Sequence, residues 1–221
     1  MVSSGVRDRL SAHESQSSFS PFLDHWIEGI FQDMAIKDDN LTFLILCGGK
    51  GRRMQGQDKP LLKYEGIPMI DRVRASAANV PVLISANRHL DAYRERGAVF
   101  TDSEVDTSIE TPLNGVLGGL ERARTAWLLV APGDTPALPA GWWTSLGQAI
   151  VPGSAGAVVY DGLRQQNLHL LLNTTLAPAL RRYLQAGHGE VWRFLKLAGI
   201  VKVDVPHPDW FININAETDL R

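Results

Sequence analysis

Short apolar runs alternate with amphipathic stretches along the chain from residue 41 onward. Runs such as "LTFLILC" are apolar throughout, which is typical of strands buried on both faces of a parallel sheet. Runs of this kind predict strands at 41–47, 80–87, 97–102, 127–134, 155–160, 168–173, 200–205 and 210–215. Apolar residues at every third or fourth position predict helices at 68–78, 112–126, 140–150, 176–187 and 190–199. Strands that alternate with helices predict an α/β domain whose mostly parallel central sheet is flanked by helices.

The first 40 residues follow a different pattern. Residues 1–20 are rich in serine and charged residues, which predicts a flexible segment. From 21 to 34 apolar side chains recur at helical spacing, after Ser20 and Pro21, two residues that suit a helix start. We therefore expect an N-terminal extension over 1–40, made of a flexible segment and one amphipathic helix, and a domain over 41–221. The helix would either dock on that domain or contact a partner.

Composition argues against a nucleic-acid-binding protein, a membrane protein and a protein with internal disulfides. The chain has 221 residues, 44% of them hydrophobic, and a formal net charge of -2, so no global field favours nucleic acid or an anionic membrane. No stretch approaches the ~18 consecutive apolar residues of a membrane span, and no signal peptide is apparent. With Cys47 as its only cysteine the chain has no internal disulfide, which fits a reducing compartment. We expect a cytoplasmic protein that binds neither nucleic acid nor membrane.

The loop after the first strand of the domain reads "LCGGKGRRMQGQDKP". It combines glycines with basic residues, namely Gly48, Gly49, Gly51, Lys50, Arg52, Arg53 and Lys59. Glycines let backbone N–H groups approach an anion closely, and arginine and lysine add charge that suits phosphates. The loop fits neither the Walker A motif nor the dinucleotide fingerprint. A phosphate-binding loop and a solvated basic turn both remain open from these residues alone.

Two aspartates follow other predicted strands of the same sheet. Asp102 lies in "VFTDSE" and Asp134 in the turn "APGDTP". In parallel sheets ligands bind beyond the carboxyl ends of the strands, so both carboxylates are expected beside the basic loop. A triphosphate brings Mg²⁺, which takes one or two carboxylates, and Asp134 is the predicted ligand. Asn213 and Asn215 would lie on one face of the last strand and reach the same edge.

These residues carry a family resemblance. The segment "LILCGGKGRRMQGQDKPLL" resembles the signature loop of the molybdenum cofactor guanylyltransferases. The blocks "SANRH", "TPLNGVLGGL", "APGDTP", "YLQAG" and "FININAETDL" are similar to later family blocks in the same order, so that the resemblance covers 41–221. It implies a three-layer, Rossmann-like nucleotidyltransferase fold. It also implies transfer of GMP from GTP to molybdopterin, which forms molybdopterin guanine dinucleotide and releases pyrophosphate.

The resemblance also implies roles for individual residues. Leu46, Cys47 and Gly48 would hold the guanine or ribose through the backbone, and Gly49, Arg53 and Lys59 would lie against the phosphates. Asp102 would contact the nucleotide, Asp134 would bind Mg²⁺, and Asn215 would be a second metal contact. Arg53, Lys59 and Asp134 are the expected catalytic residues. The partners are GTP and molybdopterin, with molybdoenzyme maturation proteins as further candidates, and the chain is expected to be a monomer or weak homo-oligomer.

The chain departs from the family pattern at several places. Cys47 stands where the family has a small residue and should pack as a small hydrophobe. Ser85 replaces an asparagine of the nucleotide site, and Asn87 is the residue that would compensate. Gln166 and Asn213 are candidates for contact with the pterin. The aromatic pairs Trp142–Trp143 and Trp192–Phe194 are interpreted as core residues rather than as a pterin stack.

Other functions stay open. Cytidylyltransferases and enzymes that act on sugar phosphates or cobinamide share the loop, although the paired glycines Gly48 and Gly49 favour guanine. A non-catalytic nucleotide-binding protein that docks through 21–34 is the alternative from another class, although Lys59, Asp102 and Asp134 are all present. A dehydrogenase lacks support because the fingerprint glycines are missing.

Overall fold

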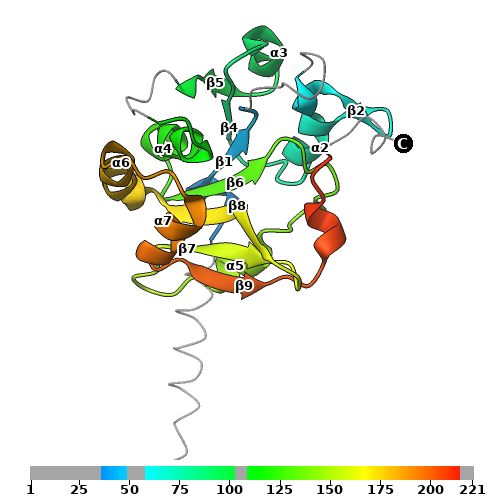
Figure 1. Cartoon of the computed structure of the whole chain (residues 1–221). Coiled ribbons are helices and arrows are strands. Elements are labelled where there is room, and N and C mark those ends of the chain that lie inside the picture. The colour runs from blue at the N-terminus through cyan, green and yellow to red at the C-terminus, as the bar shows by residue number, and fades with distance from the viewer. Residues whose placement is uncertain (1–35, 49–57, 103–108, 215–221) are drawn as a thin grey trace, which may run out of the picture. The chain divides into compact units, whose positions relative to one another are not determined.

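A seven-stranded sheet forms the centre of the domain in the computed structural model, which describes residues 36–48, 58–102 and 109–214 (Figure 1). The strands of this sheet are β1 (Leu41–Leu46), β4 (Val82–Ser85), β5 (Ala98–Phe100), β6 (Trp127–Pro132), β7 (Gly156–Tyr160), β8 (Gln165–Asn173) and β9 (Val201–Asp204). The helices are α2 (Met69–Ala75), α3 (Leu90–Arg94), α4 (Pro112–Arg122), α5 (Thr144–Gln148), α6 (Ala177–Gln185) and α7 (Val191–Leu197). The prediction of an α/β domain is confirmed.

The strand order in the sheet is β5-β4-β1-β6-β8-β7-β9. Strands β5, β4, β1 and β6 pair in parallel, as do β7 and β9, whereas β8 runs antiparallel to both of its neighbours. The carboxyl ends of β4, β1 and β6 therefore meet at one edge of the sheet, with Leu46 in register with Ser85 on one side and Pro132 on the other. This edge is where a parallel sheet places its ligands.

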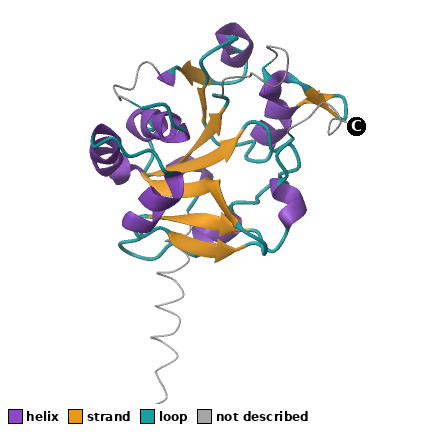
Figure 2. Ribbon diagram, in the orientation of Figure 1, coloured by secondary structure: helices purple, strands orange, loops and turns teal. Residues whose placement is uncertain are grey.

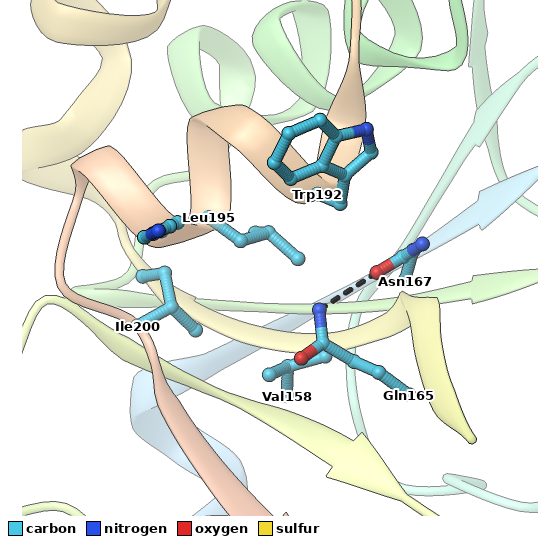
Figure 3. A pocket seen from close by; sticks show the side chains of 7 residues that line it. Val158, Gln165, Asn167, Trp192, Leu195 and Ile200 are labelled. Atoms are coloured by element: carbon cyan, nitrogen blue, oxygen red, sulfur yellow. Dashed lines mark hydrogen bonds between the residues drawn. The ribbon is translucent and has the colours of Figure 1, made fainter.

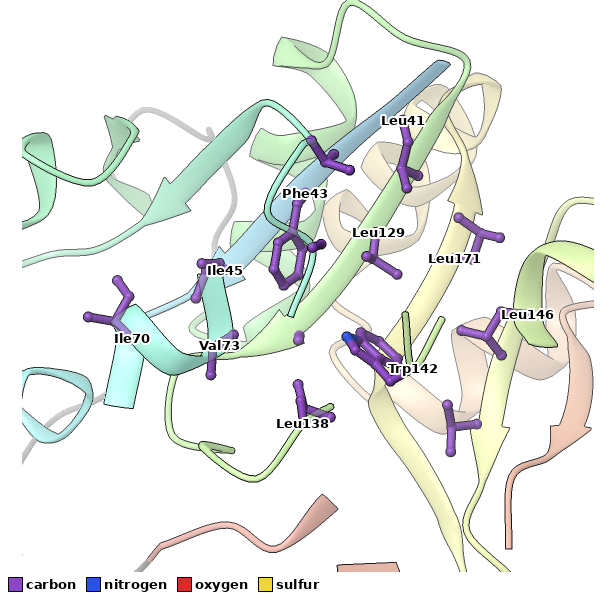
Figure 4. Packing of buried hydrophobic residues seen from close by; sticks show 14 of the residues in the cluster. Leu41, Phe43, Ile45, Ile70, Val73, Leu129, Leu138, Trp142, Leu146 and Leu171 are labelled. Atoms are coloured by element: carbon purple, nitrogen blue, oxygen red, sulfur yellow. The ribbon is translucent and has the colours of Figure 1, made fainter. Parts of the chain in front are cut away.

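Helices cover both faces of the sheet, giving three layers (Figures 1 and 2). Because successive side chains of a strand point to opposite faces, β1 contributes to two cores. Phe43 and Ile45 pack with residues of α2 and α5 on one face (Figure 4), and Leu44 packs with α4, α6 and α7 on the other. All three side chains are fully buried, which explains why the strand is apolar throughout.

Helix α4 lies unusually close to the sheet. Thr111 caps its start by accepting a hydrogen bond from the Leu113 amide, and Pro112 occupies the first turn. A Cβ on Gly115 would lie 2.7 Å from the Ser85 Oγ and 2.8 Å from the Leu46 Cδ2. Glycine at this position therefore lets the helix backbone touch the ends of β1 and β4, which compensates for its poor helix propensity.

Some of the predicted elements differ from the structure. The strand expected at 210–215 is wrong, because Pro208–Phe211 form a 3₁₀ turn and residues 212–214 are irregular. Pro208 occupies the first turn of this 3₁₀ segment, and the Ile214 amide bonds to the Asp134 carbonyl oxygen in place of a strand ladder. A small hairpin, β2 (Lys63–Tyr64) and β3 (Ile67–Pro68), and helix α3 were not predicted. The glycine ends of α6 and α7 are confirmed by left-handed backbone at Gly187 and Gly199.

The described part of the chain begins a few residues before β1. Ile36 packs against the core, and the Ala126 amide donates a hydrogen bond to the Asn40 side chain. The predicted helix at 21–34 lies outside the described residues, so the division into 1–40 and 41–221 stays a prediction. Among the helices that the structure describes, none has the length and apolar character that a membrane crossing requires.

Candidate functional site

The first residues after β4, β1 and β6 lie side by side at one edge of the sheet. The Cys47 amide donates to the Ser85 carbonyl oxygen at 2.8 Å, and the Gly133 amide donates to the Leu46 carbonyl oxygen at 2.9 Å. The start of the glycine-rich loop at Gly48 is thus fixed between two neighbouring strand ends. Side chains from these loops and from the C-terminal segment form two polar clusters.

The first cluster joins Lys59, Asp134 and Asn213. The Lys59 Nζ donates to the Asp134 Oδ2 and to the Asn213 Oδ1, each at 2.5 Å. The Asn213 Nδ2 donates in turn to the Asp134 Oδ1 at 2.9 Å. The side chains of Lys59 and Asp134 are 20% and 18% exposed, so solvent reaches the pair but screens it less than it would a surface ion pair. Mutual hydrogen bonds therefore hold three polar side chains from distant parts of the sequence together at this edge.

Local structure holds each member of this cluster in place. Lys59 begins a 3₁₀ turn, Lys59–Leu61, in which Pro60 is buried. A Cβ on Gly133 would lie 2.8 Å from the Cys47 Sγ and 3.1 Å from the Pro60 Cβ, so only glycine lets the turn bearing Asp134 approach this closely. The Ile214 amide donates to the Asp134 carbonyl oxygen at 3.1 Å, which fixes the segment that bears Asn213.

The second cluster surrounds Asp102. The Ser85 Oγ donates to its Oδ1 at 3.0 Å, and the Asn87 Nδ2 donates to its Oδ2 at 2.8 Å. The Asp102 amide donates back to the Asn87 Oδ1 at 2.9 Å. A Cβ on Gly48 would lie 3.6 Å from the Asp102 Oδ2. The carboxylate therefore stands directly beside Gly48, oriented by Ser85, which departs from the family pattern, and by Asn87, which was expected to compensate for it.

Cys47 is 4% exposed and belongs to the core, as the sequence predicted for a small hydrophobe. Burial, and next the nearby Asp58 carboxylate, raise the pKa of its thiol well above the ordinary value. Burial also raises the pKa of Asp58, which precedes Lys59 and lies near the fully buried Tyr93. Sequence reasoning assigned nothing to Asp58 or Tyr93. A thiol kept protonated fits a packing role, since the thiolate is the reactive form.

Gln166 lies on β8, and its Nε2 donates to the Asp161 Oδ2 at 2.5 Å. Asp161 is buried and also accepts hydrogen bonds from the amides of Leu163 and Arg164. Burial alone would raise the pKa of this carboxyl, but the hydrogen bonds, foremost that from the Arg164 amide, lower it overall. Asp161 follows a strand and has a glycine beside it, as Asp134 does, yet sequence reasoning overlooked it. Its carboxylate orients the Gln166 side chain.

Not all of the aromatic residues that were predicted to be core residues are buried. Trp142 and Phe194 are buried in the two cores, as expected. Trp192, however, is 56% exposed, so its interpretation as a core residue is wrong. Trp192 lies in the first turn of α7, three residues before the buried Leu195, and its indole lines a pocket between this helix and the sheet.

The described residues contain no group of three or more His, Cys, Asp or Glu side chains that could hold a metal ion as a complete protein cage. A metal that arrives with a triphosphate needs less, because phosphate and water oxygens fill most of its ligand positions. The Asp134 carboxylate and the Asn213 amide oxygen, already side by side, fit such a shared divalent ion. Gly49, Arg53 and Asn215, which were predicted to contact phosphate or metal, lie outside the described residues.

Comparison with known proteins shows which family and which proteins the chain is similar to. Residues 43–203 match the model of the MobA-like NTP transferase domain. The molybdenum cofactor guanylyltransferase of Cupriavidus metallidurans is 38% identical over 195 residues, which cover 84% of this chain and 95% of that protein. The protein of the same name from Pasteurella multocida is 35% identical over 188 residues, covering 82% and 98%.

Solved structures agree on the fold. Molybdopterin-guanine dinucleotide biosynthesis protein A from Archaeoglobus fulgidus superposes with a TM-score of 0.66 at 18% identity, covering 81% of this chain and 94% of that one. A protein from Aquifex aeolicus gives a TM-score of 0.66 at 22% identity, covering 80% and 94%. The fold class predicted from the sequence is therefore confirmed, including its three layers.

Proposed function

This chain belongs to the MobA-like NTP transferase family, and from that membership we propose that it transfers GMP from GTP to molybdopterin. The products are molybdopterin guanine dinucleotide and pyrophosphate. Support comes from relatives that carry the name molybdenum cofactor guanylyltransferase and align over most of both chains. The observation that carries the proposal is the cluster of Lys59, Asp134 and Asn213 at the edge of the sheet where β6 ends.

The proposed reaction takes place between the two substrates and requires no covalent bond to the protein. A terminal phosphate oxygen of molybdopterin forms a bond to the α-phosphorus of GTP, and the bond from that phosphorus to the bridging oxygen breaks, releasing pyrophosphate. Because the nucleophile is already an anion, no strong general base is required. The task of the side chains is to position the two substrates and to stabilise the charge that builds up on the phosphate oxygens.

Lys59 is placed for this task. Its ammonium group is held between the Asp134 carboxylate and the Asn213 amide oxygen, so its position is fixed before a nucleotide arrives. In our proposal Lys59 donates to the triphosphate, and the Asp134 and Asn213 oxygens then face a divalent ion carried by the phosphates. We propose Mg²⁺ for this ion, which would supply Lewis-acid stabilisation of the phosphate charge.

The remaining predicted contacts belong to the nucleoside. We assign Asp102, supported by Ser85 and Asn87, and the backbone of Leu46, Cys47 and Gly48 to the guanosine part of GTP. Gly49, Arg53 and Asn215 keep their predicted phosphate and metal roles. The predicted cytoplasmic location, a monomeric or weakly associating state, and contact with molybdoenzyme maturation proteins stay predictions.

Turnover with purified substrates tests the proposal. The full chain is incubated with molybdopterin and Mg²⁺, and pyrophosphate release is measured with GTP and with CTP in parallel. We expect release with GTP and little with CTP. A preference for CTP would replace guanylyl by cytidylyl transfer, and nucleotide binding without release of pyrophosphate would favour a non-catalytic binding protein. Protection of the chain against heat by GTP gives an independent measure of binding.

A further inference from the structure

A pocket of about 470 Å³ lies between α7 and the sheet strands β7 and β8 (Figure 3). Its floor is apolar, with Val158 and Leu195, and its polar lining comes from Gln165, Asn167 and Lys196. The indole of Trp192 and the side chain of Ile200 complete the lining. A volume of this size is within the range of small-molecule sites, which combine apolar walls with a few placed polar groups.

Trp192 is an exposed aromatic residue on a helix whose neighbouring side chains are buried. It lies in the first turn of α7, and just over half of its surface reaches solvent although Phe194 and Leu195 of the same helix are buried. Exposure of a large aromatic ring forgoes the stabilisation that its burial would bring. An exposed indole at the wall of a pocket offers a flat face on which a planar heterocycle stacks, a contact worth ~1–3 kcal/mol for nucleobases.

The two amides opposite complete a recognition pattern. The Gln165 Nε2 donates to the Asn167 Oδ1 at 2.7 Å, as the dashed line in Figure 3 shows. That bond fixes both side chains and leaves the Gln165 oxygen to accept and the Asn167 nitrogen to donate. An acceptor beside a donor complements a ring edge that carries N–H next to C=O. Gln166, which was the predicted pterin contact, lies between these two residues in the sequence but bonds to Asp161.

The Gln165 side of the pocket lies at the same edge of the sheet as Asp134, whereas Ile200 lines it near the amino end of β7. Gln165 pairs with Tyr160 at the carboxyl end of β7, and β8 lies between β7 and β6, the strand that leads to Asp134. The Thr111 Oγ1 donates to the Gly189 carbonyl oxygen at 2.7 Å, which joins the segment after Asp102 to the start of α7. A ring that lies against Gln165 is therefore at the edge of the sheet where the phosphates of GTP are expected.

We propose that this pocket binds the pterin ring system of the acceptor substrate, stacked on Trp192 with its lactam edge on Gln165 and Asn167. The inference rests on the proposed function, which requires a second site beside that of GTP. Guanine presents the same amino-oxo-pyrimidine edge as a pterin, so both ring systems have the right chemistry. The pterin is the assigned occupant because the nucleoside of GTP belongs beside Gly48 and Asp102, on the far side of β1 from β8.

Binding of a pterin probe to the full chain tests this assignment. Pterin-6-carboxylate is titrated with protein, and the quenching of its fluorescence gives a Kd; the Kd for GTP is measured separately by heat-stability shifts. We expect Trp192→Ala to weaken probe binding about tenfold or more, and Trp192→Phe to keep it within about threefold because the phenyl ring still stacks. Gln165→Ala and Asn167→Ala should each weaken it about threefold to tenfold. The GTP Kd should stay within about twofold in every variant.

Leu197→Ala is the matched control, since Leu197 lies on the same helix, is more exposed than Trp192 and does not line the pocket. It should leave both Kd values unchanged. An unchanged probe Kd in Trp192→Ala, the absence of saturable probe binding by the unmodified chain, or a loss of GTP binding in place of probe binding would each overturn the assignment. The proposed reaction is judged separately by pyrophosphate release from GTP and molybdopterin, so the failure of one is not mistaken for failure of the other.

Discussion

The Nζ of Lys59 lies 2.5 Å from the Oδ2 of Asp134, although 75 positions separate the two residues in the sequence. The contact joins the end of the glycine-rich segment to the turn after β6. It also neutralises a carboxylate that would otherwise repel a triphosphate. The same pair therefore has two states in the proposed reaction, one closed on itself and one opened by phosphate and a divalent ion.

Replacement of Asp134 should abolish turnover without unfolding the protein. Asp134→Ala removes the carboxylate proposed to face the divalent ion, and pyrophosphate release should fall by about 10²–10³ or more, the range seen when one electrostatic stabiliser is lost. Because the side chain is partly exposed and its turn is held by backbone hydrogen bonds, the circular dichroism spectrum and the cooperative unfolding transition should be retained.

Asp91→Ala provides the matched control for this measurement. Asp91 also forms an ion pair at 2.5 Å, with Arg94, but its side chain is 97% exposed and it lies on α3. Its loss should change neither activity nor stability by a measurable amount. Full activity of Asp134→Ala would remove the proposed role of this carboxylate.

Two glycine-to-alanine substitutions should change stability in opposite directions, because one adds a methyl group at a close contact and the other adds it where there is room. In Gly115→Ala the added methyl group would meet Ser85 and Leu46, so α4 has to move and the free energy of unfolding should fall by about 1–3 kcal/mol. In Gly147→Ala the nearest atoms lie at 3.7 Å and 3.8 Å, ordinary contacts, and the gain in helix propensity should raise it by up to about 1 kcal/mol. Urea unfolding of both variants measures the difference. Equal effects of the same sign would contradict the close approach of α4.

Several features of the fold and of the candidate site could be predicted from sequence patterns. The strands of the sheet were predictable because each is a run of buried apolar residues, and the layers followed from their alternation with helices. Asp102 and Asp134 were predictable as neighbours of the glycine-rich loop because parallel strands bring their carboxyl ends together. Local rules also identified the helix ends at Gly187 and Gly199.

Other features depend on contacts that local patterns do not encode. The apolar residues near 210–215 imitate a strand, but the neighbouring prolines and the hydrogen bond from Ile214 to Asp134 direct this segment across the strand ends. Trp192 shares the helical spacing of core residues, and only the orientation of a short helix places it outward. The buried Asp58 carries no signal that distinguishes it from a solvated turn residue. Each case was decided by tertiary packing.

His169 should make the protein sensitive to acid. Its ring is 2% exposed, packs against Trp142 and Phe211, and lies 3.4 Å from the Thr135 Oγ1. Burial lowers its pKa from 6.5 to about 3. Below pH 6.5 the unfolded chain therefore binds a proton that the folded chain does not. Folding stability should fall as the pH drops through this window, by at most about 1.4 kcal/mol per pH unit.

Urea unfolding between neutral and mildly acidic pH measures this dependence. The variant His169→Phe keeps an aromatic ring among Trp142 and Phe211 and removes the titrating group, so its stability should change less with pH over the same window. His207→Gln, at an exposed position, should retain the slope of the unmodified chain. An identical slope in the unmodified chain and in His169→Phe would refute the assignment to His169.

The two residues that orient Asp102 should control GTP affinity through it. Asn87 makes two hydrogen bonds to Asp102 and Ser85 makes one. At about 1 kcal/mol per lost bond, Asn87→Ala should raise the GTP Kd about thirtyfold and Ser85→Ala about fivefold. If both act by orienting the carboxylate, neither substitution should weaken binding further in an Asp102→Ala background, and the double-mutant cycles should show full coupling. Ser154→Ala, which removes a hydroxyl bonded only locally to the Val151 amide, is the matched control and should leave the Kd unchanged. Additive losses in the Asp102→Ala background would instead mean that Ser85 and Asn87 contact the nucleotide themselves.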